Sequence, residues 1–372
     1  MSAERIPKSA GESQCVSEAL RILIVDDSAA VRGIWKKVLT ECAGFQVVGL
    51  AENGKRGVDL VAEVKPDLVL LDIEMPVMDG LTALPLLLKA HPGVRVIMAS
   101  SLTHQSSSAA IHALALGAAD YIGKPSSTSL GVTLNEISQE LIAKIRNLKY
   151  PTLQKRKINP EVCQPLKTAA VSKIASVPMV IVIGCSTGGP NALLTVLNGI
   201  DFEKMRIPIV IVQHMPAFFI NLLAERVTKE TRRECRVISG GEVLKPGFIG
   251  IAPGDFHVEI IGTLLDARLR LTTNPPENFC RPAVDPLFRS ASQVFSNQVL
   301  GVVLTGMGED GKNGCVNICN RGGSVIVQDE ESSVVWGMPG AVAKAGLAQF
   351  ILPLQQIATS IQSVCHTGGT RA

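Results

Sequence analysis

Ser186, His214 and Asp310 are residue types that together can carry out acyl transfer, and each follows a short apolar run in the second half of the chain. In such a site the imidazole takes the proton of the serine hydroxyl, the carboxylate fixes the tautomer of the imidazole, and N–H groups at a helix amino-terminus stabilise the oxyanion. Taken singly, the histidine is better explained as a core residue and the aspartate as a helix cap. Taken together, the three residues predict a catalytic triad with Ser186 as the nucleophile.

The serine lies in a G-x-S-x-G motif, Gly184-Cys-Ser-Thr-Gly188, followed by Gly189 and Pro190. In α/β-hydrolases this motif exposes the nucleophile on a sharp turn between a strand and a helix. The same small residues can also form a plain turn or bind a phosphate, so the motif alone does not decide. The chain order of α/β-hydrolases is serine, acid, histidine. The order serine, histidine, aspartate therefore predicts another doubly wound, mostly parallel α/β topology.

Apolar runs at residues 179–183, 207–212 and 300–304 predict buried parallel strands, and residues 190–197 predict a helix. The carboxyl ends of parallel strands lie at one edge of a sheet, where open α/β sheets bind their ligands. We therefore expect the serine, the histidine and the aspartate to meet at this edge. His257, which follows a predicted turn into a strand, is the alternative base.

The first half of the chain has a second set of reactive side chains at the ends of predicted strands. Helical patterns alternate with these strands, which indicates a βα series with a parallel sheet. The predicted strands are residues 21–25, 68–72, 94–99 and 120–123, and the predicted helices are residues 31–42, 54–64, 81–90, 109–116 and 134–148. The side chains at the strand ends are Asp26, Asp27, Asp72, Ser100 and Lys124.

Three of these side chains are carboxylates, which repel one another at a sheet edge unless a hard divalent cation joins them. Oxygen ligands together with a phosphate are what Mg²⁺ prefers. Asp72 is then the phosphate acceptor, and Lys124 offsets charge on the transferred group. Singly, Asp26 and Asp27 are explained as helix caps and Lys124 as a surface lysine. Four such groups, all at the ends of predicted strands, favour a phosphorylation site.

Residues 20–148 resemble the response-regulator receiver domain. The matching residues are Asp26-Asp27, Asp72 in Asp-Ile-Glu-Met-Pro-Val-Met-Asp-Gly, Ser100, Tyr121 and Lys124-Pro125. The resemblance implies a flavodoxin-like (βα)₅ fold and phosphorylation of Asp72 by a histidine kinase. It also implies that Ser100, Tyr121 and Lys124 are the switch and phosphate-binding residues, and that Mg²⁺ lies among Asp26, Asp27, Asp72 and the backbone carbonyl of Glu74.

Residues 180–352 resemble the CheB family of chemotaxis-specific protein-glutamate methylesterases. The matching motifs are Ile183-Gly-Cys-Ser-Thr-Gly-Gly-Pro190, Gln213-His-Met-Pro216, Ala252-Pro-Gly-Asp255, Arg281-Pro-Ala-Val-Asp285, Leu304-Thr-Gly-Met-Gly-Glu-Asp-Gly311, Val327-Gln-Asp-Glu330 and Trp336-Gly-Met-Pro339. The chain departs from the common family pattern at Cys185, where alanine is usual, and at Trp336, where tyrosine or phenylalanine is usual. Neither is a triad position.

This second resemblance implies a triad of Ser186, His214 and Asp310, with Thr187 and Met307 near the oxyanion. The implied reactions are hydrolysis of glutamate methyl esters on methyl-accepting chemotaxis receptors to methanol and glutamate, and deamidation of specific glutamines with release of ammonia. Neither reaction needs a cofactor. In the family the unphosphorylated receiver blocks the active site, so phosphorylation is expected to activate the enzyme in chemosensory adaptation.

The length of 372 residues, with 46% hydrophobic and 19% charged residues, predicts two folded domains rather than one core or a disordered chain. We expect a disordered tail at residues 1–19, the receiver at 20–148, a linker at 149–177, the catalytic domain at 178–365 and a tail at 366–372. Residues 146–173 contain seven basic residues and one acid. This charge either keeps the linker solvated or guides docking to an acidic surface.

The net charge of +3 and the lack of a basic helix-turn-helix pattern argue against nucleic-acid binding. No apolar run approaches the roughly 20 residues of a membrane span, and residues 1–19 lack the core of a signal peptide. We therefore expect a cytoplasmic monomer without membrane insertion. Nine scattered cysteines favour reduced thiols, with no structural metal. The alternative function is a phosphorylation-controlled binding protein without catalysis.

Overall fold

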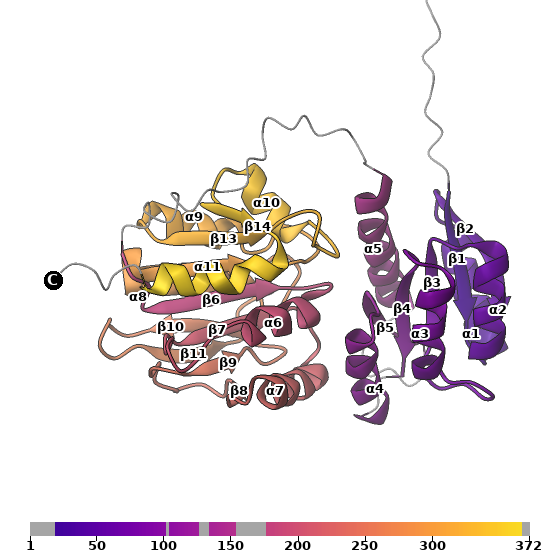
Figure 1. Cartoon of the computed structure of the whole chain (residues 1–372), viewed down its shortest axis with the longest axis horizontal. Helices are drawn as coiled ribbons and strands as arrows, with labels where there is room; N and C mark the ends of the chain where they lie inside the picture. The colour runs from indigo at the N-terminus through magenta and orange to yellow at the C-terminus, as the bar shows by residue number, and fades with distance from the viewer. Residues whose placement is uncertain (1–18, 102–103, 126–133, 154–175, 367–372) are drawn as a thin grey trace, which may run out of the picture.

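The computed structural model describes residues 19–101, 104–125, 134–153 and 176–366, and within them two parallel sheets flanked by helices (Figure 1). The first sheet has the order β2-β1-β3-β4-β5, with parallel pairing throughout. This is the flavodoxin-like order, so the expected (βα)₅ fold is confirmed. Its elements are β1 Leu20–Val25, α1 Ala29–Thr40, β2 Phe45–Ala51, α2 Gly54–Val64, β3 Leu68–Asp72, α3 Gly80–Ala90, β4 Arg95–Ser100, α4 His104–Ala115, β5 Asp120–Gly123 and α5 Leu134–Leu153.

Strand β2 was absent from the strands predicted by apolar runs. It pairs with β1 at the edge of the sheet, and only Ala51 of its seven residues is buried. A half-exposed edge strand has no continuous apolar run, so its signal is weak. The helix α5 also continues to Leu153, five residues into the predicted linker. The rest of that linker up to residue 175, like residues 1–18 and 367–372, lies outside the described residues.

The second sheet has the order β14-β13-β12-β6-β7-β9-β8, and its paired strands are all parallel. The hairpin of β10 and β11 is a separate antiparallel pair. The elements are β6 Val180–Cys185, α6 Gly189–Asn198, β7 Ile209–Gln213, α7 Ala217–Thr231, β8 Cys235–Val237, β9 Ile249–Ile251, β10 His257–Ile261, β11 Arg268–Thr272, α8 Val284–Phe295, the 3₁₀ turn Ser296–Gln298, β12 Val299–Val303, α9 Lys312–Asn320, β13 Ser324–Gln328, α10 Met338–Lys344, β14 Phe350–Leu352 and α11 Leu354–His366.

The centre of this sheet is the pair β6 and β12. All residues of both strands are buried, as expected for parallel strands with helices on both faces. The chain runs from β6 toward β7 on one side and from β12 toward β13 on the other. The strand order therefore reverses between β6 and β12, which confirms the doubly wound prediction and creates a crevice at their carboxyl ends.

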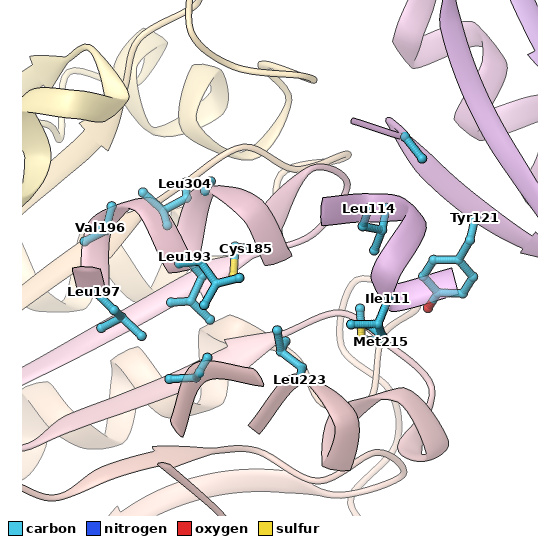
Figure 2. Packing of buried hydrophobic residues seen from close by; sticks show 14 of the residues in the cluster. Ile111, Leu114, Tyr121, Cys185, Leu193, Val196, Leu197, Met215, Leu223 and Leu304 are labelled. Carbon is cyan, nitrogen blue, oxygen red and sulfur yellow. The ribbon is translucent and has the colours of Figure 1, made fainter. Parts of the chain in front are cut away.

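The two domains share an apolar interface made by α4 and β5 of the first domain (Figures 1 and 2). Ile111, Leu114 and Tyr121 belong to the same buried cluster as Met215 and Phe219 of the second domain. The rings of Tyr121 and Phe219 lie 4.4 Å apart between centroids. The first domain therefore packs on the second sheet beside the carboxyl ends of its central strands. No helix within the described ranges has both the length and the apolar character needed to cross a membrane.

Candidate active site

Ser186 stands at the turn between β6 and α6. Its N–H donates to the carbonyl of Thr305 at 3.0 Å, and its own carbonyl accepts from the N–H of Gly189 at 2.7 Å. Gly188 caps α6 with φ 74°, and a Cβ there would lie 2.5 Å from the side chain of Val334. Only glycine fits this positive φ and close approach. The backbone therefore holds the serine at the carboxyl end of the central strand.

His214 follows β7, the neighbour of β6, and its N–H donates to the carbonyl of Cys185 at 3.0 Å. Its Nε2 lies 2.8 Å from Oδ2 of Asp310, which comes after β12 on the other side of β6. The structure thus brings the predicted base and the predicted acid into direct contact across the strand that carries the serine.

Asp310 is buried against the amino-terminus of α8. It accepts from the N–H of Val284 at 2.6 Å, of Asp285 at 3.1 Å and of Gly311 at 2.9 Å. The first N–H groups of a helix have no partner within the helix, and the helix dipole favours a negative charge there. The side-chain amide of Asn278 donates a further bond at 2.9 Å. These donors hold the carboxylate in one orientation toward the imidazole.

The electrostatics of the pair favour the ionised forms of both groups. Burial alone would raise the pKa of Asp310, but the hydrogen bond and charge of His214 and the backbone donors lower it below its ordinary value. Burial alone would lower the pKa of His214, but Asp310 and the thiol of Cys280 raise it to about 10. This arrangement therefore favours the protonated form of the imidazole.

The remaining ring nitrogen of His214 contacts Cys280 rather than the serine. The Sγ atom of Cys280 lies 3.5 Å from Nδ1. Within the described part of the chain, no hydrogen bond joins Ser186 to His214. Since Nε2 faces Asp310, Nδ1 is the nitrogen that would take the serine proton. The structure therefore assembles the acid and the base, but not the contact between base and nucleophile.

Thr187, predicted to lie near the oxyanion, is engaged by the other domain. Its Oγ1 donates to Oδ2 of Asp120 in β5 at 2.7 Å. The other oxygen of Asp120 accepts from Nζ of Lys144 at 3.2 Å and from the N–H of Tyr121 at 2.8 Å. The backbone N–H groups of Thr187 and Met307 have no hydrogen-bond partner among the described residues. Both are therefore available as donors.

A hollow of about 840 Å³ contains the serine, the histidine and the aspartate, and both domains line it. The first domain closes one side with Asp120, Tyr121, Glu136, Gln139, Glu140 and Lys144. Met307 packs against an apolar cluster that includes Ile137 and Leu141 of α5. The side chain of His214 is only 10% exposed as a result. Both domains therefore form the walls around the serine in this arrangement.

His257, the alternative base, lies in β10 and is 1% exposed. Its Nε2 lies 3.1 Å from the carbonyl of Pro275, and its Nδ1 accepts from the N–H of Ala283 at 3.1 Å. Both ring nitrogens are thus used by the backbone. The structure places this histidine in the core, where it supports the start of α8.

The acidic site of the first domain lies at the carboxyl ends of β1 and β3. Oxygen atoms of Asp26, Asp27 and Asp72 lie within 4.8 Å of one another. Nζ of Lys124 lies 2.6 Å from Oδ2 of Asp72 and 3.1 Å from Oδ2 of Asp26. Burial raises the pKa of Asp72 to about 6, against the lowering effect of Lys124. The carboxylates are crowded and only partly neutralised.

This donor set fits a magnesium ion. Three carboxylates supply hard oxygen ligands, and a cavity of about 260 Å³ opens beside them. The cavity is lined by Asp27, Asp72, Ile73, Glu74, Ser101 and Lys124. It has room for a cation and a phosphoryl group at the buried Asp72.

Comparisons with known proteins place both domains in known families. Residues 181–361 match the CheB methylesterase family, and residues 22–134 match the response regulator receiver domain. A protein-glutamate methylesterase/protein-glutamine glutaminase of Paramagnetospirillum magneticum is 44% identical over 94% of this chain and 97% of its own length. A protein of the same name from Maricaulis maris is 42% identical over 92% of this chain and 94% of its own.

This chain belongs to the CheB methylesterase family. A solved structure, the CheB methylesterase catalytic domain of Thermotoga maritima, is 37% identical, covers 50% of this chain and 99% of its own, and has a TM-score of 0.48. The family membership extends over both domains, because the two relatives match nearly the whole chain.

Two of the residues that the receiver resemblance named as switches lie on the adjacent strands β4 and β5. Ser100 is buried at the end of β4, and its Oγ donates to the carbonyl of Ser101 at 3.0 Å. Tyr121 is buried in the domain interface (Figure 2). Nζ of Lys144 lies 4.7 Å from the centre of its ring. Burial and the charges of Asp120 and Glu140 raise the pKa of Tyr121, so its hydroxyl is neutral.

Sequence reasoning missed four residues that contact the site, namely Asn278, Cys280, Asp120 and Lys144. Asn278 and Cys280 lie in an irregular turn without a periodic pattern. The turn directly precedes the family motif Arg281-Pro-Ala-Val-Asp285. Asp120 and Thr187 are 67 positions apart and in different domains. No local signal indicates such a contact.

Proposed function

We propose that this protein is a phosphorylation-activated serine hydrolase that removes methyl groups from glutamate methyl esters on methyl-accepting chemotaxis receptors and deamidates specific glutamines. Ser186 is the nucleophile, His214 the base and Asp310 the carboxylate that orients the base. The observation that carries the proposal is the 2.8 Å contact between Nε2 of His214 and Oδ2 of Asp310 across the strand end that holds Ser186. The names of the relatives supply the substrate class.

The first step is attack of Ser186 Oγ on the ester carbonyl while Nδ1 of His214 takes the hydroxyl proton. The N–H groups of Thr187 and Met307 receive the developing oxyanion. The tetrahedral intermediate then expels methoxide, which takes the proton from His214 and leaves as methanol. A water molecule, deprotonated by the same histidine, hydrolyses the acyl-enzyme and releases the glutamate side chain. A glutamine substrate follows the same path with ammonia as the leaving group.

Before this chemistry can begin, the contacts that now occupy the site must change. Nδ1 of His214 must leave Cys280 and meet the serine, and Thr187 must lose its bond to Asp120. Both changes follow if the receiver moves away from the hollow. When the receiver moves, Asp120 and its neighbours leave the hollow. Water can then reach the imidazole, and the substrate can enter. The docked receiver thus acts as an inhibitor of the hydrolase.

Phosphorylation of Asp72 by a chemotaxis histidine kinase is the proposed signal for this movement. Asp26, Asp27, Asp72 and the backbone carbonyl of Glu74 would hold Mg²⁺, which neutralises the carboxylates and the transferred phosphoryl group when bound. Lys124 then contacts the phosphoryl group. Ser100 and Tyr121 link this site to the domain interface, because Tyr121 packs directly on Phe219 of the hydrolase.

The decisive experiment measures methanol release from methyl-labelled receptor membranes by the full-length protein in the presence of Mg²⁺ and a phosphodonor. The wild-type protein should release methanol, and Ser186→Ala should release none above background. Cys185→Ala is the matched control, since this neighbour of the serine is buried and does not line the hollow. Equal release by wild type and Ser186→Ala would contradict the proposal and favour a binding protein without catalysis.

A further inference from the structure

The turn Glu277–Cys280 at the edge of the hollow has an unusual backbone. Glu277 and Cys280 exchange two backbone hydrogen bonds, of 3.2 and 2.9 Å. Between them, Asn278 has φ 51° and Phe279 has φ 63°. Two consecutive positive φ values are typical of a type I′ turn, in which asparagine followed by glycine is preferred. Phenylalanine in the second position is an outlier, because a bulky residue rarely adopts this conformation.

Contacts on both sides of Phe279 hold the turn in place. The amide of Asn278 donates to Oδ1 of Asp310 at 2.9 Å and to Oδ2 of Asp285 at 3.0 Å. On the other side, Sγ of Cys280 lies 3.5 Å from Nδ1 of His214. The two neighbours of Phe279 are therefore tied to the acid and the base of the proposed triad. Strained backbone conformations of this kind persist where the surroundings fix them, and they cluster at functional sites.

The side chain of Phe279 itself is fully exposed, with a relative exposure of 104%, although the residue lines the same hollow as Ser186. Exposure of an apolar ring to water is unfavourable, and so is a positive φ at a phenylalanine. Glycine at this position would avoid both costs. Neither the conformation nor the solvation of the free protein explains the phenylalanine, which points to a partner that covers the ring.

We propose that Phe279 is a docking residue for the receptor helix that carries the methyl ester. On a helix, a residue three or four positions from the modified glutamate lies on the same face, so an apolar side chain there can cover the ring while the ester enters the hollow. This inference rests on the proposed function, and it adds the residue that binds the polypeptide around the ester. Aromatic residues at the edge of a site commonly anchor such contacts.

The docked receiver forms one side of the hollow but leaves Phe279 in solvent. The receptor can therefore contact Phe279 before the receiver moves. Docking at this residue is then independent of phosphorylation, whereas turnover is not.

The test uses the full-length protein with Mg²⁺ and a phosphodonor, and compares wild type with Phe279→Asn. Asparagine tolerates a positive φ, so this variant removes the ring and keeps the turn. We expect the KM for methylated receptor membranes to rise about tenfold or more, with kcat nearly unchanged. Hydrolysis of p-nitrophenyl acetate, which carries no polypeptide that could cover Phe279, should keep its kcat/KM. Phe279→Leu, which retains an apolar side chain, should stay close to wild type.

Leu265→Asn is the matched control. Leu265 is 93% exposed between β10 and β11 and does not line the hollow, so its loss should change neither KM. An unchanged receptor KM in Phe279→Asn overturns the proposal. An equal loss with both substrates also overturns it, because the turn would then only position the triad.

A binding measurement separates this inference from the proposed function. Unphosphorylated Ser186→Ala protein should sediment with methylated receptor membranes, and the double variant with Phe279→Asn should sediment about tenfold more weakly. Equal sedimentation of the two contradicts docking at Phe279. Failure of the wild-type protein to release methanol contradicts the proposed function, while the sedimentation result still decides the docking residue.

Discussion

Asp72 is the last residue of the central strand β3, and Asp310 lies in the loop after the central strand β12. Both are buried carboxylates, yet their surroundings differ. Asp310 accepts bonds from three backbone N–H groups, from Asn278 and from His214, and these lower its pKa. Asp72 accepts one backbone bond, from Glu74 at 3.3 Å, and contacts Lys124, and burial raises its pKa to about 6. The same residue type therefore has its pKa shifted in opposite directions.

The difference follows from what each carboxylate is proposed to do. An orienting carboxylate must stay ionised and fixed, so its oxygens are saturated by donors that do not move. A carboxylate that attacks phosphorus must keep an oxygen free for the new bond, so its charge has to be offset by mobile partners. Lys124 and a metal ion can serve that purpose. A shortage of donors at Asp72 is thus a requirement of the proposed chemistry.

The largest expected effect is at Asp72. Asp72→Asn should abolish labelling by radioactive acetyl phosphate in the presence of Mg²⁺, because the amide is not a nucleophile. Asp79→Asn is the control, since this exposed carboxylate only caps α3 through Thr82. Removal of Mg²⁺ with a chelator should abolish the labelling of the wild-type protein as well. Labelling of Asp72→Asn, or labelling without metal, would contradict the assignment of this site.

At Asp310 the expected loss is large but incomplete. Asp310→Asn should reduce the kcat of methanol release by about 10⁴-fold, because the oxyanion donors remain while the histidine loses its orienting partner. The thermal unfolding temperature must be measured in parallel, since α8 loses its capping carboxylate. His257→Ala is the control for Asp310→Asn. Loss of this core histidine should lower the stability of the protein and leave the triad chemistry in place. A variant Asp310→Asn with wild-type kcat would remove Asp310 from the proposed triad.

A smaller effect is expected from the carboxylate that joins the two domains. Asp120→Asn weakens the bond to Thr187 and the ion pair with Lys144. The methylesterase activity of the unphosphorylated protein should rise about 5- to 10-fold, since a charge-assisted bond contributes about 1–1.5 kcal/mol more than a neutral one. Activity with a phosphodonor should stay the same. Glu140→Gln is the control, because it alters the surroundings of Lys144 without touching Thr187. An unchanged basal rate in Asp120→Asn would show that the bond between Asp120 and Thr187 does not restrain the enzyme.

The smallest effect is a shift in pH dependence. The base must be neutral to accept a proton, so activity should rise with pH along a limb set by the pKa of His214. Asp310 raises this pKa, and the limb should lie above the ordinary histidine value of about 6.5. In Asp310→Asn the limb should move to lower pH by about one unit or more. Initial rates of p-nitrophenyl acetate hydrolysis across this range provide the measurement, and a limb that does not move contradicts the coupling.

The central strands β6, β7 and β12 were predicted, because each forms a buried apolar run with a polar residue soon after it. Ser186, His214 and Asp310 follow three adjacent strands, so their common edge could be inferred from the chain alone. Strand β2 could not, because its exposed residues interrupt the apolar pattern. Hydrophobic periodicity reports burial, and it therefore identifies the centre of a sheet better than its edge.

The parts of the site that escaped prediction depend on contacts between distant segments. The role of α8 as a donor of N–H groups to Asp310 arises only when two loops are brought together by the sheet. The contact between Cys280 and His214 depends on the shape of one turn. Neither the identity nor the spacing of these residues contains that information, which only the folded structure shows.

Two side chains of the hydrolase hold the receiver through the backbone of α4. Asn191 donates to the carbonyl of Leu114, and Arg226 donates to the carbonyl of Ile111 at 3.4 Å. Every residue type offers the same carbonyl, so these two contacts tolerate substitution along α4. A change that unwinds the last turn of α4 removes both acceptors together. A receiver transplanted from a related chain should therefore inhibit this hydrolase if its fourth helix ends in the same shape, even when few surface residues are shared.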